Sequence, residues 1–159
     1  CVSEGRCEKA PAFPRCQETF PPDVLQRPEA YPGIVLFGTL TNRTNAAHVP
    51  RENAIQLALD QANELTGDSG TKFGLIKCDI AGKQPKYDAL EEEKAAIASA
   101  HYLHDVMGIP AVFGPFGSAV LLSVYTEMKG SGLLLFSPSA TADSLTALDN
   151  AKPTDDQQA

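Results

Sequence analysis

The sequence has no tryptophan, and none of its apolar runs approaches the roughly 20 residues that a membrane-spanning helix requires. Basic residues are scarce: 13 lysines and arginines stand against 20 aspartates and glutamates, a formal net charge of -7. This balance argues against nucleic acid and against anionic lipid as partners. The start of the sequence lacks the pattern of a signal peptide, so we expect any export signal to have been removed or to lie outside it.

Motifs for catalysis and for metal binding are missing as well. The sequence contains no GxSxG, no HExxH and no glycine-rich phosphate loop, and Gly114–Ser118 lacks the lysine that a phosphate loop needs. No CxxC and no Cys/His pair has the spacing of zinc ligands. His101 and His104 flank the apolar side of a helical pattern, which favours two surface histidines. We therefore predict a protein that is not an enzyme and that carries no metal and no cofactor.

The 159 residues suffice for one domain with a proper core and are too few for two full lobes. We expect a Cys- and Pro-rich extended leader over residues 1–32, a single lobe over 33–150, and the start of a crossover to a second lobe over 151–159. The leader contains too many prolines for a regular element. They are Pro11, Pro14, Pro21, Pro22, Pro28 and Pro32.

Three of the four cysteines lie in the leader, and the fourth ends an apolar run. A short leader without a core of its own gains stability from disulfides, which form in oxidising compartments. Of the three complete pairings, we prefer Cys1–Cys7, which closes a small loop, together with Cys16–Cys78, which pins the leader to the sheet. Two alternatives stay open: four reduced thiols, or a Cys1 that carries a lipid anchor and leaves an odd set of three.

Four short apolar runs predict buried strands, and helical patterns fill the intervals between them. The runs are residues 34–37, 73–76, 111–113 and 133–136. This alternation predicts an open, doubly wound, mostly parallel α/β sheet with helices on both faces, in a single Rossmann-like lobe. With the strands numbered along the chain, we expect the order 2-1-3-4.

The three helical patterns differ in length. The longest is expected over Asp88–Met107, and another begins at Ser118, which is suited to cap it. The first follows Pro50 and ends before Gly67, a common stop signal. Its apolar face consists of Ala54, Leu57, Ala58, Ala62 and Leu65.

In open parallel sheets, ligands bind beyond the carboxyl ends of strands, where the strand order reverses. For the order 2-1-3-4, this point lies between the first and third strands, so Thr41 and Asn42 become candidate ligand-binding residues. Arg43 is a cation in the same loop and a candidate counter-ion for an anionic ligand, although a solvated arginine is favoured. On the third strand's side, Ser118 and the amides after it are suited to hold a carboxylate at the positive end of a helix dipole. Capping that helix is an equally simple role for Ser118.

Four segments together resemble the N-terminal lobe of type I periplasmic binding proteins, the family of leucine/isoleucine/valine-binding proteins. Residues 34–41 match the family's first strand and loop, and residues 54–63 its "G-x-x-L-A-v-d-x-i-N" helix. Residues 113–118 are similar to its "i-G-p-x-x-S" turn. Residues 136–145 are close to its "i-S-p-x-A-T-x-x-L" signature, the most specific of the four.

The resemblance implies an extracytoplasmic solute receptor that binds an amino acid or a similar small polar ligand for a transporter or sensor. It implies that Ser118, Ser139 and Thr141 bind the ligand's carboxylate and ammonium groups. An ABC permease or a sensor protein is the implied partner, and the implied location is periplasmic or extracellular, with membrane contact solely through a lipid anchor on Cys1. The loop at 42–48 and Cys78-Asp79-Ile80 depart from the family's glycine-rich turn and paired acidic residues.

Two other readings stay open. One is a degenerate lobe without an amino-acid site. The other is a flavodoxin-like or response-regulator-like signalling domain, because both share the doubly wound architecture. A phosphoacceptor domain needs an acidic cluster at its strand ends and a lysine beyond a later strand. Here Asp79 stands alone, and no such lysine follows residues 133–136.

Overall fold

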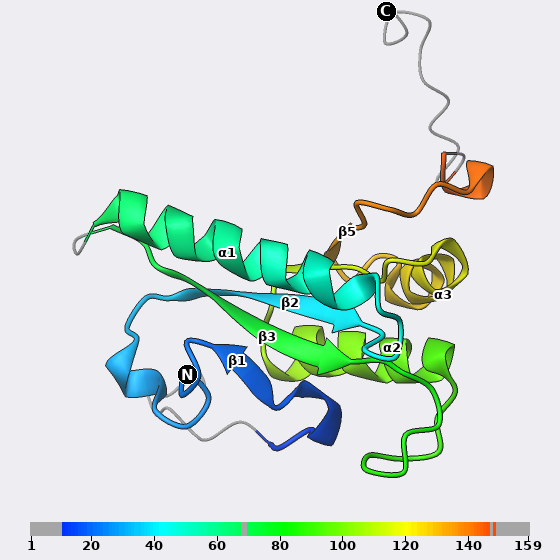
Figure 1. The fold of residues 1–159 in the computed structure, drawn as a ribbon, viewed down its shortest axis with the longest axis horizontal. Coiled ribbons are helices and arrows are strands. Elements are labelled where there is room, and N and C mark those ends of the chain that lie inside the picture. Colours follow the sequence, from blue (N-terminus) through cyan, green and yellow to red (C-terminus); the bar gives the residue numbers. More distant parts are fainter. Residues whose placement is uncertain (1–10, 68–69, 147, 149–159) are drawn as a thin grey trace, which may run out of the picture.

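A computed structural model describes residues 11–67, 70–146 and 148 of the chain. Its centre is a five-stranded sheet between two helical layers (Figure 1). Helix α1 (His48–Thr66) lies on one face, and α2 (Glu92–His101) and α3 (Ser118–Met128) pack against each other on the opposite face. The prediction of an α/β lobe with helices on both faces is confirmed at this level. None of the described helices is both long and apolar enough to cross a membrane.

The sheet is built around its longest parallel pair. Strand β2 (Val35–Thr41) lies between β3 (Phe73–Asp79) and β4 (Ala111–Phe113), parallel to both, and β5 (Leu134–Phe136) extends the sheet beyond β4. At the opposite edge, the short strand β1 (Glu18–Phe20) runs antiparallel to β3. The carboxyl ends of β2 to β5 therefore meet at one edge of the sheet.

The order of the whole sheet, β1-β3-β2-β4-β5, differs from the predicted four-strand order 2-1-3-4. The difference is β1, because the leader was expected to be extended and free of regular elements. Besides β1, the leader forms two short 3-10 helices, Pro14–Cys16 and Pro28–Ala30. Among themselves, the four parallel strands follow one another as β3-β2-β4-β5.

The prediction that the longest helix spans Asp88–Met107 is wrong. The helix there begins at Glu92, because the Asp88 carboxylate accepts hydrogen bonds from Arg15 and from the Leu90 amide and so belongs to the preceding loop. It ends in a π-helical turn, Tyr102–Val106. The longest helix is α1, with 19 residues.

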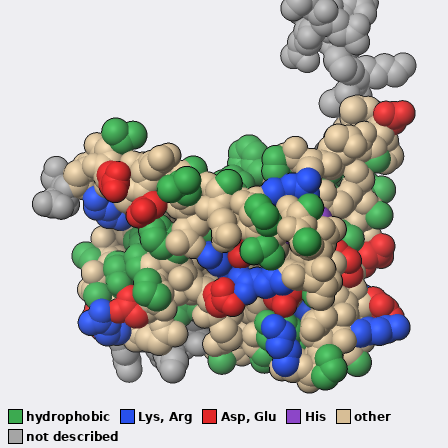
Figure 2. Space-filling view, viewed as in Figure 1, with side chains coloured by type: hydrophobic (Ala, Val, Ile, Leu, Met, Phe, Trp, Pro, Cys, Tyr) green, Lys and Arg blue, Asp and Glu red, His purple; other side chains and the backbone are tan. Residues whose placement is uncertain are grey.

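Helix α1 does not pack on its apolar face. Leu57 and Leu65 are 57% and 89% exposed, and hydrophobic side chains stand on the outer surface of this helix (Figure 2). Its two buried residues are His48 and Glu52, both polar. The buried side of α1 is therefore defined by a polar network at its first turns and not by the predicted apolar stripe.

The main core lies between the sheet and the α2–α3 layer. Leu40 and Val112 of the sheet meet Leu103 and Val124 of the helices there, all fully buried. Gly38 allows this approach, since a Cβ at that position would lie 2.6 Å from the Leu103 Cδ1 atom. The carboxyl ends of β2 and β4 are thereby fixed by close packing against the α2–α3 layer.

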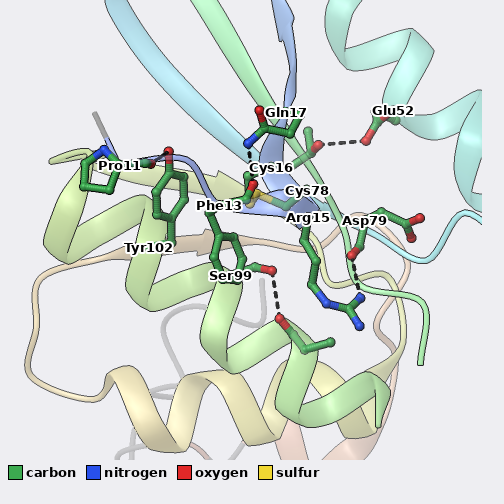
Figure 3. The surroundings of a disulfide bond; sticks show 12 residues. Pro11, Phe13, Arg15, Cys16, Gln17, Glu52, Cys78, Asp79, Ser99 and Tyr102 are labelled. Carbon is green, nitrogen blue, oxygen red and sulfur yellow. Dashed lines mark hydrogen bonds between the residues drawn. A yellow bond between two sulfur atoms is a disulfide. The ribbon is translucent and has the colours of Figure 1, made fainter. Parts of the chain in front are cut away.

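The disulfide Cys16–Cys78 joins the leader to β3, as predicted. Beside it, Phe13 stacks on Tyr102 with ring centroids 5.0 Å apart (Figure 3). The buried Arg15 donates hydrogen bonds of 2.9 Å to the carbonyl oxygens of Asp79 and Ala81. The leader is thus covalently and electrostatically bound to the end of β3. The predicted pair Cys1–Cys7 lies outside the described residues and stays a prediction.

Candidate functional site

The candidate site lies at the carboxyl edge of the sheet, where three loops follow neighbouring parallel strands. They are residues 42–47 after β2, 114–117 after β4 and 137–142 after β5. The close pairing Thr39 to Phe113 and Phe113 to Phe136 places these loops side by side. This is the edge at which the sequence predicted a ligand.

Serine hydroxyls join the second and third of these loops. The Ser137 hydroxyl donates to the Pro115 carbonyl at 2.7 Å, and the Ser139 hydroxyl donates to the Phe116 carbonyl at 2.9 Å. The Gly114 amide donates to the Phe136 carbonyl at 2.6 Å. The two turns therefore form one hydrogen-bonded unit instead of two independent rims.

Ser118 completes this unit from the first position of α3. Its Oγ accepts hydrogen bonds from the amides of Thr141 and Ala142, at 3.1 and 3.2 Å. It does not cap α3 through its side chain: Gly117 occupies the cap position, with no side-chain cap bond. Because a hydroxyl has two acceptor sites and one hydrogen, the Ser118 hydrogen remains available to a ligand.

The first turn of α3 supplies further donors beside this hydroxyl. The Leu121 amide makes the first helical bond, to the Gly117 carbonyl. The amides before it, at Ser118, Ala119 and Val120, point out of the helix end, as the first amides of any helix do. Together with the helix dipole, they favour a negatively charged group next to Ser118.

Gly114 is required at the start of this loop. Its φ is +90°, and a Cβ there would lie 2.6 Å from the Leu40 carbonyl oxygen. A side chain would push the β4 loop away from β2. The glycine thus sets how closely the second loop approaches the end of β2.

The remaining predicted site residues differ in accessibility. Thr141 is exposed and Ser139 partly buried, whereas Thr41 is fully buried in β2, with an Oγ1 that has no partner among the described residues. The Asn42 side chain accepts hydrogen bonds from the Thr44 amide and hydroxyl, as in an Asx turn. The structure therefore brings Ser118, Ser139 and Thr141 together, buries Thr41 in β2 and gives Asn42 a role in its own turn.

Arg43 is not a solvated arginine. Its guanidinium pairs with the buried Glu52, Nη2 to Oε1 at 2.9 Å, and also with Glu18 of β1. The hydrogen bond from Arg43 holds the pKa of Glu18 below its ordinary value. The Thr39 hydroxyl donates to the other oxygen of Glu52 at 2.8 Å. Figure 2 shows acidic and basic side chains interleaved near the ends of β2 and β3. Arg43 is thus committed inside the protein and is not a free counter-ion.

Sequence reasoning missed Phe116 of the second loop and two residues of α1, His48 and Arg51, that contact its ring. Phe116 is 3% exposed. Its ring centroid lies 5.2 Å from that of the His48 ring, in a T-shaped arrangement. The Arg51 guanidinium lies over the Phe116 ring, with Cζ 5.6 Å from the centroid. Burial lowers the pKa of His48, and the charge of Arg51 adds to this effect. The available signal was the spacing of His48 and Glu52, one helical turn apart, so that both face the end of β2.

The two histidines of the α2 region lie at the surface, as expected. The side chains of His101 and His104 are 43% and 28% exposed and contact Asp105. Within residues 11–67, 70–146 and 148, no group of three or more His, Cys, Asp or Glu side chains is arranged to hold a metal ion.

Solved structures of substrate-binding proteins share this fold. The branched-chain amino acid transporter substrate-binding protein LivJ from Streptococcus pneumoniae, in complex with isoleucine, is 23% identical, with a TM-score of 0.58 over 71% of this chain and 31% of that one. An ABC transporter substrate-binding protein from Desulfitobacterium hafniense, in complex with leucine, is 24% identical, with a TM-score of 0.58 over 73% of this chain and 32% of that one. The fold class is therefore that of a substrate-binding-protein lobe.

The sequence comparison adds a particular relative. The chain is 34% identical to the Leu/Ile/Val-binding protein BraC3 of Rhizobium johnstonii over 131 residues. This alignment covers 79% of this chain and 33% of the relative. No family model matches the chain. The chain is thus a homologue of a Leu/Ile/Val-binding protein, a type I periplasmic binding protein, and spans about a third of its length.

Proposed function

We propose that the chain is a ligand-binding lobe of an extracytoplasmic solute-binding protein that takes an amino acid or a similar small polar ligand. The observation that carries this proposal is the Ser118 hydroxyl, which joins the two turns through two accepted hydrogen bonds and keeps its own hydrogen for a ligand. The amides at the start of α3 favour the ligand's carboxylate beside it. Thr141 and Ser139 offer oxygen atoms for the ammonium group.

The relatives support the wider setting of this proposal. LivJ and the Desulfitobacterium hafniense protein are described as substrate-binding proteins of transporters, with isoleucine or leucine bound. We propose delivery to an ABC permease or a sensor protein, in the periplasm or outside the cell. The Cys16–Cys78 disulfide supports an oxidising compartment. A lipid anchor on Cys1 is the alternative to the Cys1–Cys7 disulfide within this proposal, because one sulfur atom cannot form both bonds.

The described edge contacts a ligand from one side, whereas ligand pockets bury most of a small molecule's surface. We therefore expect weak binding by the 159-residue chain, with a Kd above about 0.1 mM. Titration of the 15N-labelled chain with L-leucine, L-glutamine and L-glutamate, followed by amide chemical shifts, measures affinities in this range. A sub-micromolar Kd would contradict the expectation.

The Ser118→Ala variant tests the site itself. It removes the donor to the ligand's carboxylate, and we expect the Kd to rise about tenfold, the usual effect of losing a hydrogen bond to a charged group. Ser118→Thr keeps the hydroxyl and is expected to retain binding. Ser123→Ala is the matched control, since Ser123 lies partly exposed on the same helix and its hydroxyl donates to the Ala119 carbonyl. The proposal fails if no amino acid shifts the amides at 118–120 and 141.

A further inference from the structure

Arg51 lies at the edge where the ligand is proposed to bind and has no acidic partner among the described residues. Among the other described arginines, Arg15, Arg27 and Arg43 each pair with an aspartate or glutamate. No ion pair or hydrogen bond joins the Arg51 side chain to any residue in the described part of the chain, and its contact there is the Phe116 ring.

This contact fixes the guanidinium without using its donors. A guanidinium stacked on an aromatic face keeps its N–H groups in its own plane, where they remain free to bind a planar carboxylate in bidentate fashion. His48 contacts the same phenyl ring in a T-shaped arrangement, with the ring centroids 5.2 Å apart. Arg51 is thus preorganised by the Phe116 ring for a hydrogen-bond acceptor that the described residues do not provide.

The contact also places Arg51 at the proposed site. Phe116 lies two residues before Ser118, and its carbonyl accepts the Ser139 hydroxyl at 2.9 Å. Arg51 lies in the first turn of α1 and Ser118 begins α3, and these helices follow β2 and β4, which are parallel neighbours. A ligand bound at Ser118 therefore lies beside the loop that Arg51 covers.

The surroundings leave the charge of Arg51 uncompensated. Glu52, the next residue along α1, is buried and already paired with Arg43. His48 is 8% exposed, and its Nδ1 has no partner among the described residues, so one buried nitrogen beside the Phe116 ring lacks a hydrogen bond there. Buried polar groups are normally satisfied, which points to a polar ligand or a water there.

We propose that Arg51 binds a second carboxylate of the ligand, so that the site selects an acidic amino acid or another short dicarboxylate over an apolar amino acid. This inference rests on the proposed function, because it needs a first carboxylate held at Ser118. It differs from the isoleucine and leucine bound by the two solved relatives.

The test compares L-glutamate with its neutral isostere L-glutamine, and with L-leucine, in the titration described above at matched ionic strength. We expect L-glutamate to bind about tenfold more tightly than L-glutamine, the usual effect of a charge-assisted hydrogen bond. Arg51→Gln is expected to abolish this preference, and Arg51→Lys to keep part of it, since a lysine retains the charge without the fork. Arg27→Gln, a charge removal in the leader, is the matched control.

Each outcome separates the two proposals. Equal affinities for L-glutamate and L-glutamine, or a preference that Arg51→Gln leaves unchanged, overturns the role of Arg51 while Ser118-dependent binding stands. A failure of all three amino acids to shift the amides at 118–120 overturns both. The proposal is supported by a preference for L-glutamate that is lost in Arg51→Gln, provided that the amide spectrum of this variant shows a folded chain.

Discussion

Arg43 lies between two carboxylates that differ in exposure. The Glu52 side chain is 3% exposed and accepts a second hydrogen bond from Thr39, whereas the Glu18 side chain is 64% exposed. Removing one partner of a buried pair leaves an uncompensated charge and costs several kcal/mol, whereas exposed pairs contribute little. The same guanidinium therefore takes part in one strong and one weak interaction.

We expect Glu52→Gln to lower the free energy of unfolding by about 3 kcal/mol, since a neutral amide leaves Arg43 without its buried counter-charge. Glu18→Gln is the matched control, and a loss below about 0.5 kcal/mol is expected there. Urea denaturation of both variants measures the difference. Equal losses in the two variants would show that burial does not decide the strength of these pairs.

At the scale of elements, β1 depends on contacts made outside its own three residues. Its register pairs Glu18 with Lys77, next to the bond between Cys16 and Cys78. A three-residue edge strand has little stability of its own. The disulfide and the buried Arg15 therefore keep β1 on the sheet.

We expect the double variant Cys16→Ala/Cys78→Ala to lose about 4 kcal/mol of stability, because the bond closes a loop across a sequence separation of 62 residues. The loss should be accompanied by faster amide exchange in β1 than in β2. The wild-type chain, unfolded and refolded with a reductant, is the control and should show at least the same loss, because a Cys1–Cys7 bond would be reduced as well. Unchanged exchange in β1 would mean that hydrogen bonds alone hold this strand.

The elements that the sequence predicted well are those with a local pattern. Residues 111–113 and the helix beginning at Ser118 agree with β4 and α3, because apolar periodicity and a glycine-rich turn decide them. Strand β1 was missed because its pairing is long-range and depends on Cys78. The buried face of α1 was missed because Glu52 is satisfied by Thr39 and Arg43, which no single-helix pattern reveals.

The hydroxyl-bearing residues of the candidate site could be predicted from the sequence, but the contacts between them could not. Ser118, Ser139 and Thr141 follow recognisable strand ends, so their gathering at one edge was expected from a parallel sheet. That they bond to the opposite loop, and that Arg51 stacks on Phe116, depends on the packing of α1 against β2 and β4. Sequence spacing alone does not determine that packing.

At the scale of the whole molecule, two histidines shift the pH dependence of stability in opposite directions. The hydrogen bond with Asp105 raises the pKa of His101. The contribution of His101 to the free energy of unfolding is therefore complete below pH 6.5 and is lost as the pH rises through the pKa in the folded chain. Burial lowers the pKa of His48 from 6.5. Its contribution is present above 6.5 and is lost as the pH falls towards the folded value, because the unfolded chain then binds more protons.

We expect His48→Phe to remove the second effect while keeping a ring against Phe116. Because Nδ1 of His48 has no partner among the described residues, its replacement by carbon should cost little at neutral pH. The free energy of unfolding of the wild type minus that of the variant should therefore fall as the pH is lowered from about 7.5 to about 5. Urea denaturation across this range measures the difference.

His101→Gln is the control with the opposite sign. The free energy of unfolding of the wild type minus that of this variant should rise on acidification. A difference for His48→Phe that stays constant with pH would show that this imidazole titrates alike in the folded and unfolded chain. The charge of Glu92 on α2, which raises the pKa of His48, would then balance both its burial and the charge of Arg51.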